Sequence, residues 1–486
     1  MPLRRRRTPD HHTFELVDGV EDRDPEGADS GITGEPVDPE VESMPGSRRP
    51  RRVVVAGVVA LALVLGGAVV VDTVRSRAQD DRLTVTRGGM LPLDTAPSRM
   101  WKVKATDGVA SVGGALVTVV RGEVIGVDLD TGAELWRTDL GAPASCGPSS
   151  WRVEPQVSDG LVCVTEEPFR VVVLGDGGRV RSDRALDTAD GPASPGPGID
   201  LVRAVRTGEP GAAGEDLDVV VRLEDAISGE VRWEETTPFE PDSWACTTTE
   251  GGLTMVNSQP LQVYGGGGMI EVYGCGVGAT FDVKGRRLDD PGTPEDRVWP
   301  ALGGGFLRVV GSPDGTGVQE SELLGPDGPV VRVPGEILDP MSADGDVDVW
   351  LVVEEGGTVR AVDRSGGALW TAEGLDRPDG VLTHAAGVVV VSSAQGTTGL
   401  DAATGRELWN QPDDGTYDVA GAMTDGDNVI IVRSPVDGAF GVTVEALDLG
   451  DGSTSWTLDD SPLEGYPLTV QGRLFLMDNS TVTRIG

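Results

Sequence analysis

The residues that could form a metal or catalytic site are few. Four carboxylates take the first, third, fifth and twelfth positions of a calcium-binding loop: Asp344, Asp346, Asp348 and Glu355. Val349 stands at the sixth position, where such a loop needs glycine for its sharp turn, and the residues from Val349 to Val353 are as apolar as a buried strand. We therefore expect an acidic turn leading into a strand, and no metal site.

Other signals of chemistry are equally weak. The chain has three histidines, of which two lie in the N-terminal tail, so that His384 is the one imidazole beyond it, at a turn entering an apolar run. The glycine-rich stretches 265–269 and 274–278 are followed by neither a helical pattern nor a lysine, as a phosphate-binding loop requires. No Gly-x-Ser-x-Gly elbow occurs. We predict no catalytic, cofactor-binding or metal-binding residues, no cofactor and no enzyme activity.

Composition points to a large β-rich protein. The 486 residues include 70 Gly and 33 Pro, with 38% hydrophobic residues, which is too apolar for a disordered chain and too rich in turn formers for a helical bundle. The net charge of −39 would repel a phosphate backbone, so nucleic-acid binding is not expected.

The N-terminal part predicts a membrane anchor. Residues 1–52 alternate basic and acidic stretches without apolar periodicity, which is typical of a disordered tail. An uncharged run from Val53 to Val71 is long enough to cross a bilayer as a helix, so we expect a transmembrane helix at 53–72 and a linker at 73–97. A cleaved signal peptide is the alternative. Arginines directly before the run favour a cytoplasmic N-terminus, with residues 98–486 outside the cytoplasm.

Cysteine usage agrees with that topology. All four cysteines lie beyond the apolar run, in two local pairs: Cys146 with Cys163, and Cys246 with Cys275. An even, locally paired set suits disulfides in an oxidising compartment, and we favour these two pairings because each closes a short loop. Four free buried thiols are the alternative.

One phrase recurs through the rest of the chain. An Asp is followed four residues later by Gly and eight residues later by Trp in four copies: Asp128/Gly132/Trp136, Asp225/Gly229/Trp233, Asp401/Gly405/Trp409 and Asp448/Gly452/Trp456. A fifth copy, from Asp363 to Trp370, is one residue shorter. Weaker relatives without Trp occupy Val171–Arg181, Ala279–Leu288 and Ser321–Val331.

The phrase describes a β-hairpin, with a strand ending in Asp, a turn with Gly, and a second strand carrying Trp. With a second hairpin before most copies, each repeat of about 40–50 residues holds about four strands, and radial stacking of such sheets is a β-propeller. We predict an all-β propeller over residues 98–486 with eight blades, allowing seven or nine. The segment around Trp101 should add the outermost strand to a blade whose other strands come from the C-terminus, so that no edge is left free.

The phrases GLDAATGRELW (399–409) and GVDLDTGAELW (126–136) resemble the pyrroloquinoline quinone (PQQ)-like repeat of quinoprotein alcohol dehydrogenase-like propellers and of a propeller lipoprotein of bacterial outer-membrane assembly. The resemblance implies that the repeat tryptophans dock between blades: Trp101, Trp136, Trp233, Trp370, Trp409 and Trp456. The enzymes of that family carry a disulfide between adjacent cysteines at the cofactor, whereas the closest cysteines here are 17 residues apart. We therefore expect a non-enzymatic, membrane-anchored member.

The expected function is a scaffold outside the cytoplasm that binds a protein or an envelope ligand. The alternative is a PQQ- or calcium-dependent enzyme or a small-ligand sensor. Arginine-rich, lysine-poor usage, with three Lys, hints at a bacterium with a GC-rich genome and a Gram-positive envelope, to which an outer-membrane role would not transfer.

Overall fold

The computed structural model describes residues 76–93, 97–106, 109–148, 158–207, 218–240, 248–249, 252–253, 261–290, 297–311, 318–325, 331–345, 347–372, 374–375, 377–413, 415–436, 441–463, 465–478 and 480–486. The predicted tail at 1–52 and membrane helix at 53–72 therefore lie outside the described residues. No helix within the described ranges combines the length and the apolar character needed to cross a bilayer.

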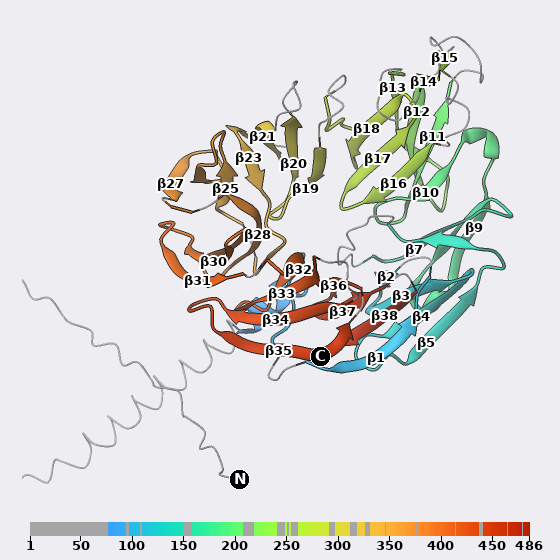
Figure 1. Ribbon diagram of the computed structural model, residues 1–486. Helices are drawn as coiled ribbons and strands as arrows, with labels where there is room; N and C mark the ends of the chain where they lie inside the picture. The colour runs from blue at the N-terminus through green and yellow to red at the C-terminus, as the bar shows by residue number, and fades with distance from the viewer. Residues whose placement is uncertain are drawn as a thin grey trace, which may run out of the picture. The chain divides into compact units, whose positions relative to one another are not determined.

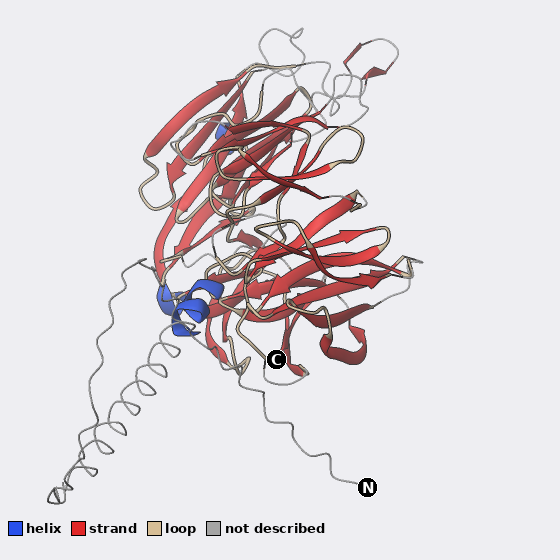
Figure 2. Cartoon of the chain, turned by 90° about the vertical axis from the view of Figure 1, so that its left-hand side faces the viewer, coloured by secondary structure: helices blue, strands red, loops and turns tan. Residues whose placement is uncertain are grey.

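The described chain is built almost wholly from antiparallel sheets (Figures 1 and 2). The first three are β2–β5 (Val109–Val112, Ala115–Val120, Glu123–Asp128, Glu134–Asp139), β6–β9 (Ala144–Cys146, Leu161–Thr165, Arg170–Leu174, Val180–Ala185) and β10–β13 (Ala193–Pro195, Asp200–Arg206, Val219–Asp225, Val231–Thr237). Then come β16–β18 (Gln262–Gly266, Met269–Gly274, Val277–Asp282) and β19–β22 (Arg297–Pro300, Phe306–Gly311, Val318–Leu324, Val331–Pro334).

The second half continues in the same way. One sheet joins β23 (Glu336–Leu338) to β25–β27 (Trp350–Val353, Val359–Val362, Ala368–Ala372), and the next is β28–β31 (Pro378–Ala385, Val388–Ser393, Gly396–Asp401, Glu407–Pro412). The short β24 (Ser342–Ala343) pairs in parallel with β28. The last two sheets are β32–β35 (Tyr417–Thr424, Asn428–Pro435, Val442–Asp448, Thr454–Leu463) and β36–β38 (Tyr466–Val470, Arg473–Met477, Thr481–Ile485) completed by β1 (Arg99–Lys104). A separate ribbon pairs β14 (Thr248–Thr249) with β15 (Gly252–Leu253).

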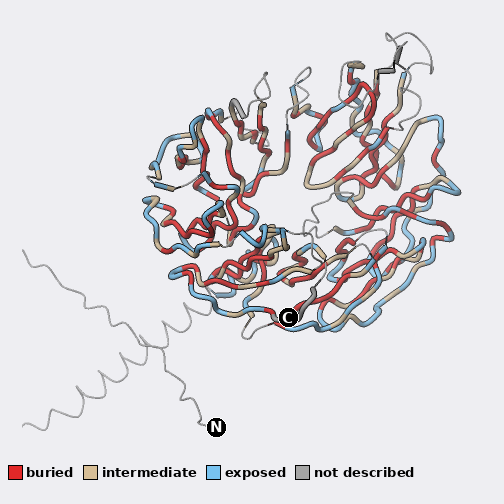
Figure 3. Tube along the Cα trace, in the orientation of Figure 1, coloured by how far each residue is buried: buried red, intermediate tan, exposed pale blue. Residues whose placement is uncertain are grey.

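The exposure of the side chains differs between the inner and outer strands of each sheet. The second strands are apolar on both faces; β3 and β7, for example, are buried almost throughout. The fourth strands alternate between exposed and half-buried residues, as in β5 and β9. Figure 3 shows this difference as buried trace along the inner strands and exposed trace along the outer ones. The first strand of each sheet therefore lies innermost and the fourth lies at the rim.

Among the described residues, nine hydrophobic clusters hold the sheets together, and each joins one sheet to the next. One cluster joins β2–β5 to β6–β9, around Val117, Val119, Cys163 and Val172. The last link joins β36–β38 back to β2–β5, with Phe475 and Val482 packed on Leu116 and Val127. The smallest joins β16–β18 to β19–β22 through five buried residues. Because the series of contacts returns to its first member, the sheets form a closed ring, the arrangement of a β-propeller.

The ring closes as the sequence predicts. Strand β1, which contains Trp101, pairs antiparallel with β38 and becomes the outer strand of the sheet formed by the C-terminus. Ser98 and Gly486 exchange two backbone hydrogen bonds of 3.0 Å at the junction.

The described residues form nine sheets of three to five strands, antiparallel apart from the short β24, whereas the sequence favoured eight blades and allowed seven or nine. The eight followed from supposing that one weak repeat is an insertion. All three weak repeats instead contribute paired strands: β8 with β9, β17 with β18, and β21 with β22. Their loss of Trp does not prevent pairing because strand pairing needs backbone hydrogen bonds and one buried face, not an indole.

Residues that we assigned to a linker, at 73–97, include a segment that packs on the sheets. Residues 76–83 are helical, and Leu83 and Met90 are 0% and 1% exposed. We call residues 76–93 the docking segment.

Candidate interaction site

The repeated aspartates organise the turn between the third and fourth strands. In the turn after β30, Asp401 Oδ1 accepts hydrogen bonds from the backbone N–H groups of Ala403 and Thr404 and from the Thr404 hydroxyl. These bonds, the one from the Thr404 hydroxyl foremost, lower the pKa of Asp401. Gly405 closes the turn with φ of +71°, a conformation that a residue with a Cβ adopts only under strain.

Five of the repeat tryptophans pack on the turn glycine of the next sheet around the ring. A Cβ at Gly405 would lie 2.3 Å from Cε3 of Trp370, which belongs to β27 of the preceding sheet. The Trp370 indole N–H also donates to the carbonyl oxygen of Ala402 at 2.8 Å. Glycine is therefore required twice here, for its backbone conformation and for the space that the indole occupies.

The same contact recurs around the ring. The pairs are Trp101 on Gly132, Trp136 on Gly178, Trp233 on Gly285 and Trp409 on Gly452. Trp101, Trp233 and Trp409 donate their indole N–H to turn carbonyls at 3.1, 3.0 and 2.8 Å. The structure thus places these tryptophans at contacts between neighbouring sheets.

Trp456 is the exception. Its indole nitrogen is buried without a hydrogen-bond partner. The next sheet around the ring is the one in which β38 meets β1, so the two ends of the propeller, Ser98 and Gly486, stand where the other sheets have an Asp–Gly turn. Trp456 therefore has no turn carbonyl to bond.

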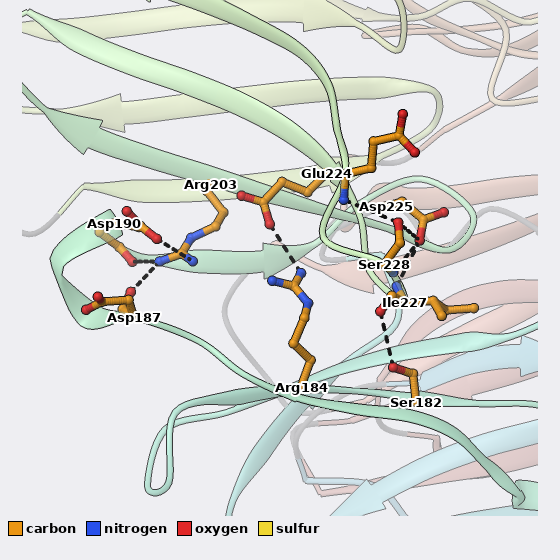
Figure 4. Close-up of polar contacts among 11 residues, drawn as sticks. Ser182, Arg184, Asp187, Asp190, Arg203, Glu224, Asp225, Ile227 and Ser228 are labelled. Carbon is orange, nitrogen blue, oxygen red and sulfur yellow. Dashed lines mark hydrogen bonds and ion pairs between the residues drawn. The ribbon is translucent and has the colours of Figure 1, made fainter.

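A polar group replaces Trp between β6–β9 and β10–β13 (Figure 4). Ser182 pairs with Val173 just before a bulge, the position that Trp136 and Trp233 hold in their sheets. Its hydroxyl donates to the carbonyl of Ile227 in the next sheet at 3.4 Å. Sequence reasoning missed this equivalent because it searched for Trp and not for the residue paired before the bulge.

Arg184 lies where an indole would pack, since a Cβ at the turn glycine Gly229 would lie 3.0 Å from its Nη1. Arg184 donates to Glu224, whose side chain is 8% exposed, at 3.2 Å. The buried Arg203 donates to the carbonyls of Asp187 and Gly191 at 2.6 and 3.1 Å (Figure 4). Burial lowers the pKa of Arg203. These bonds tie turns to strands.

The acidic turn before β25 does not assemble a metal site from its described residues. Asp344 accepts a hydrogen bond from the backbone of Ala386, and Asp348 lies 3.5 Å from Nε2 of His384. Burial lowers the pKa of His384, against the opposing effect of Asp348. Asp346 lies outside the described residues, and no group of three or more metal-ligating side chains occurs among those described.

The cysteines form disulfides wherever they are described. Cys146 and Cys163 are bonded to each other across β6 and β7. Cys275 is also disulfide-bonded, and the described residues contain no free cysteine. Cys246 lies outside the described residues.

A groove of about 800 Å³ lies where the last sheet meets the first. Charged and hydroxyl side chains line it, among them Lys104, Arg121, Glu123, Asp139 and Thr481. Arg121 belongs to the turn between the second and third strands of its sheet, and Thr481 begins the third strand of the other. The groove therefore lies on the side of the ring where second and third strands connect, which we call the second-turn face.

The opposite side, where first and second strands connect, carries the docking segment; we call it the first-turn face. Arg87 donates to the carbonyl of Pro300 at 3.0 Å and to Asp339, which is 5% exposed, at 2.5 Å. Pro300 ends the first strand of its sheet, β19, and Asp339 directly follows the first strand of the next sheet, β23.

The backbone of the docking segment continues along the same face. Met90 N donates to Thr424 O at 2.9 Å, Thr424 N returns a bond to Gly88 O at 2.9 Å, and Leu91 N donates to Gly472 O at 2.7 Å. Met90 enters the cluster between β32–β35 and β36–β38. A Cβ at Gly88 would lie 2.5 Å from Cβ of Ser342 in β24, so this approach requires glycine.

These contacts link the docking segment to five consecutive sheets, from β19–β22 to β36–β38. The sequence offered a signal that we did not use: a Gly88–Gly89 pair beside apolar Leu83 and Met90 in a stretch assigned to a linker.

The sheets form a ring in which a Trp of one sheet packs on a turn Gly of the next. This arrangement defines a propeller of the PQQ-like repeat class. The chain belongs to the family described as outer membrane protein assembly factor BamB, whose model matches residues 93–269 and 355–482. The unmatched residues 270–354 contain the whole of β19–β22 and much of the sheets on either side.

No curated protein matches the chain in sequence. Among solved structures, it is similar to BamB from Moraxella catarrhalis, with 16% identity, a TM-score of 0.40, and coverage of 80% of this chain and 99% of that one. It is also similar to the computationally designed Ika8 protein, with 12% identity, a TM-score of 0.35, and coverage of 82% and 99%. For the quinohemoprotein alcohol dehydrogenase ADHIIG from Pseudomonas putida HK5 the values are 11% identity, a TM-score of 0.37, and coverage of 83% and 78%.

Proposed function

We propose that the chain is a membrane-anchored scaffold whose nine-bladed propeller, one blade for each described sheet, binds a protein partner outside the cytoplasm. The family match carries the proposal, because the family is named for a factor in protein assembly. The family match identifies neither the partner of this chain nor the membrane in which it acts.

The use of polar residues supports a scaffold over an enzyme. The repeat aspartates, glycines and tryptophans serve the turns and the contacts between sheets. The His384 imidazole is buried, and its nearest charged partner is Asp348 at 3.5 Å. We propose that the protein is not an enzyme.

Membrane anchorage and topology rest on the sequence. The uncharged run from Val53 to Val71 is long enough to span a bilayer, and the arginines before it favour a cytoplasmic N-terminus. The bonded Cys146–Cys163 pair supports an oxidising compartment for the propeller.

Protease added to whole cells tests the topology. A protease site inserted at the exposed turn residue Ala394 should be cut in intact cells, while an epitope at the N-terminus should survive. Cleavage only after the cells are opened would contradict the topology. Cross-linking from the same turn in intact cells, with mass spectrometry of the products, then identifies the partner.

A separate assay tests the enzymatic alternative. Purified protein mixed with PQQ and calcium should show no change in the cofactor absorbance and no dye-linked oxidation of alcohols. Saturable binding with turnover would contradict the non-enzymatic assignment.

A further inference from the structure

The docking segment fixes which face of the propeller can meet a partner. We propose that the first-turn face lies toward the membrane and that the second-turn face is the surface open to a protein partner. This inference rests on the proposed membrane anchor and deepens it, because it names the face.

The first step is the rigidity of the docking segment. Leu83 and Met90 are buried, and Arg87 forms an ion pair of 2.5 Å with the buried Asp339. Close approaches at two glycines add to this, since a Cβ at Gly88 would lie 2.5 Å from Ser342 and one at Gly426 would lie 2.0 Å from Gln79. A segment held by buried apolar, ionic and backbone contacts to five sheets moves with the propeller and is not a flexible tether.

The second step is chain length. Four residues, from Asp72 to Arg75, separate the end of the apolar run from the helical residues that begin at 76. Five peptide steps reach at most about 18 Å, even when fully extended. Ser76, where the docking segment begins, is therefore confined to that distance from the end of the proposed membrane-spanning run, which holds the first-turn face beneath the segment toward the bilayer.

The third step is what remains accessible. With the first-turn face partly covered by the chain's own residues and held near the bilayer, a partner from the aqueous side meets the second-turn face. That face carries the polar groove lined by Lys104, Arg121, Glu123 and Asp139. Its charged lining fits a hydrophilic protein segment.

One sheet offers a matched pair of positions for the test. Ala394 lies in the turn between β29 and β30 on the second-turn face, and Ala403 lies in the turn between β30 and β31 on the opposite face; both are exposed. Strand β30 has six residues, so the two positions lie about 20 Å or more apart along it.

The experiment uses full-length Ala394→Cys and Ala403→Cys variants, labelled with a fluorescent donor and reconstituted into liposomes with acceptor-labelled lipid headgroups. We expect at least twofold higher energy transfer from position 403 than from position 394. Equal transfer, or higher transfer from 394, in protein that stays with the liposomes would overturn the inference alone. Protein that fails to associate with the liposomes would overturn the proposed anchor and this inference with it.

A second variant tests whether the docking segment sets the orientation. Adding Leu83→Ser and Arg87→Ala to each labelled protein removes the buried contacts of the segment while leaving the apolar run unchanged. We expect the ratio of transfer from 403 and 394 to fall to about one. A ratio that stays above two would show that the docking segment does not orient the propeller, and would overturn the argument.

Discussion

At the scale of single residues, the glycine that receives the indole carries two constraints at once. Gly405 and Gly415 both have φ near +70°, but a Cβ at Gly405 would meet Trp370 at 2.3 Å, whereas nothing lies within 4 Å of one at Gly415. Alanine substitutions at these two glycines therefore separate the effect of backbone strain from the effect of a steric clash with the indole.

We predict that Gly405→Ala lowers the free energy of unfolding by about 2–5 kcal/mol, the sum of left-handed strain and overpacking. Gly415→Ala should cost about 1–2 kcal/mol from strain alone. Urea unfolding of the full chain in detergent measures both. Equal losses of unfolding free energy in the two variants would mean that the Trp370 indole shifts to make room for the new Cβ at no energetic cost.

The tryptophans offer a second comparison. Trp409 donates to the carbonyl of Leu449 at 2.8 Å, whereas the indole nitrogen of Trp456 has no partner. We predict that Trp409→Phe destabilises the protein by about 1 kcal/mol more than Trp456→Phe, because only the first change breaks a hydrogen bond. Thermal unfolding of the two variants side by side measures the difference, and the reverse order would contradict the role of the turn carbonyl.

The acidic turn at Asp478 predicts a pH dependence. Burial would raise the pKa of Asp478, but hydrogen bonds from Thr481 and Ser480 outweigh it and lower the pKa from 3.8 to about 2. A depressed carboxyl pKa stabilises the folded state above the unfolded value, and that contribution is lost as the pH falls from about 4 toward 2.

We therefore expect the acid-induced loss of stability in that window to weaken in Asp478→Asn. Thr481→Val, which removes one donor, should move the loss to higher pH. Unfolding midpoints measured from pH 5 to pH 2 test this, and superimposable curves for all three proteins would contradict it.

At the scale of elements, the docking segment is the main departure from the sequence-based picture. Its ion pair between Arg87 and Asp339 has side chains 16% and 5% exposed, so removing the arginine leaves a buried carboxylate without its cation. It also removes the hydrogen bonds to the carbonyls of Pro300 and Pro340.

We predict that Arg87→Ala lowers the free energy of unfolding by about 3–5 kcal/mol. Arg77→Ala, an exposed position in the same segment, should change it by less than about 0.5 kcal/mol. Denaturant titration of the two variants compares them. A small effect of Arg87→Ala would mean that the segment is held by its apolar residues alone.

The strands themselves were largely predictable, since alternation of apolar residues and the Asp–Gly turn act locally. The contacts at Ser182 and Arg87 were not. Ser182 is recognisable only through its pairing with Val173, and Arg87 only through Asp339, which lies 252 residues away in the chain. The sequence favoured eight blades and allowed seven or nine, because a repeat without Trp has a weak sequence signature; two of these repeats still pair their third and fourth strands, β8 with β9 and β21 with β22.

At the scale of the whole molecule, stability depends on closing the ring. Strand β38 pairs with β37 on one side and with β1 on the other, so it joins the two ends of the propeller. Val482 and Ile485 are both fully buried and belong to two different clusters between sheets.

We predict that deleting residues 481–486 prevents folding, because the loss of a central strand exceeds the 5–15 kcal/mol of stability typical of a domain. Deleting residues 2–47 should leave the unfolding midpoint unchanged. Circular dichroism and limited proteolysis of the two truncated proteins distinguish these outcomes. A folded protein without β38 would show that eight sheets suffice.

Because Ser98 and Gly486 are hydrogen-bonded to each other, the two ends of the propeller could be joined covalently at this point. A short Asp-x-Thr-Gly connector between the two residues would supply the carbonyl that the Trp456 indole lacks. New chain termini could then be placed in another loop. A circular permutant built in this way should fold with every indole seated.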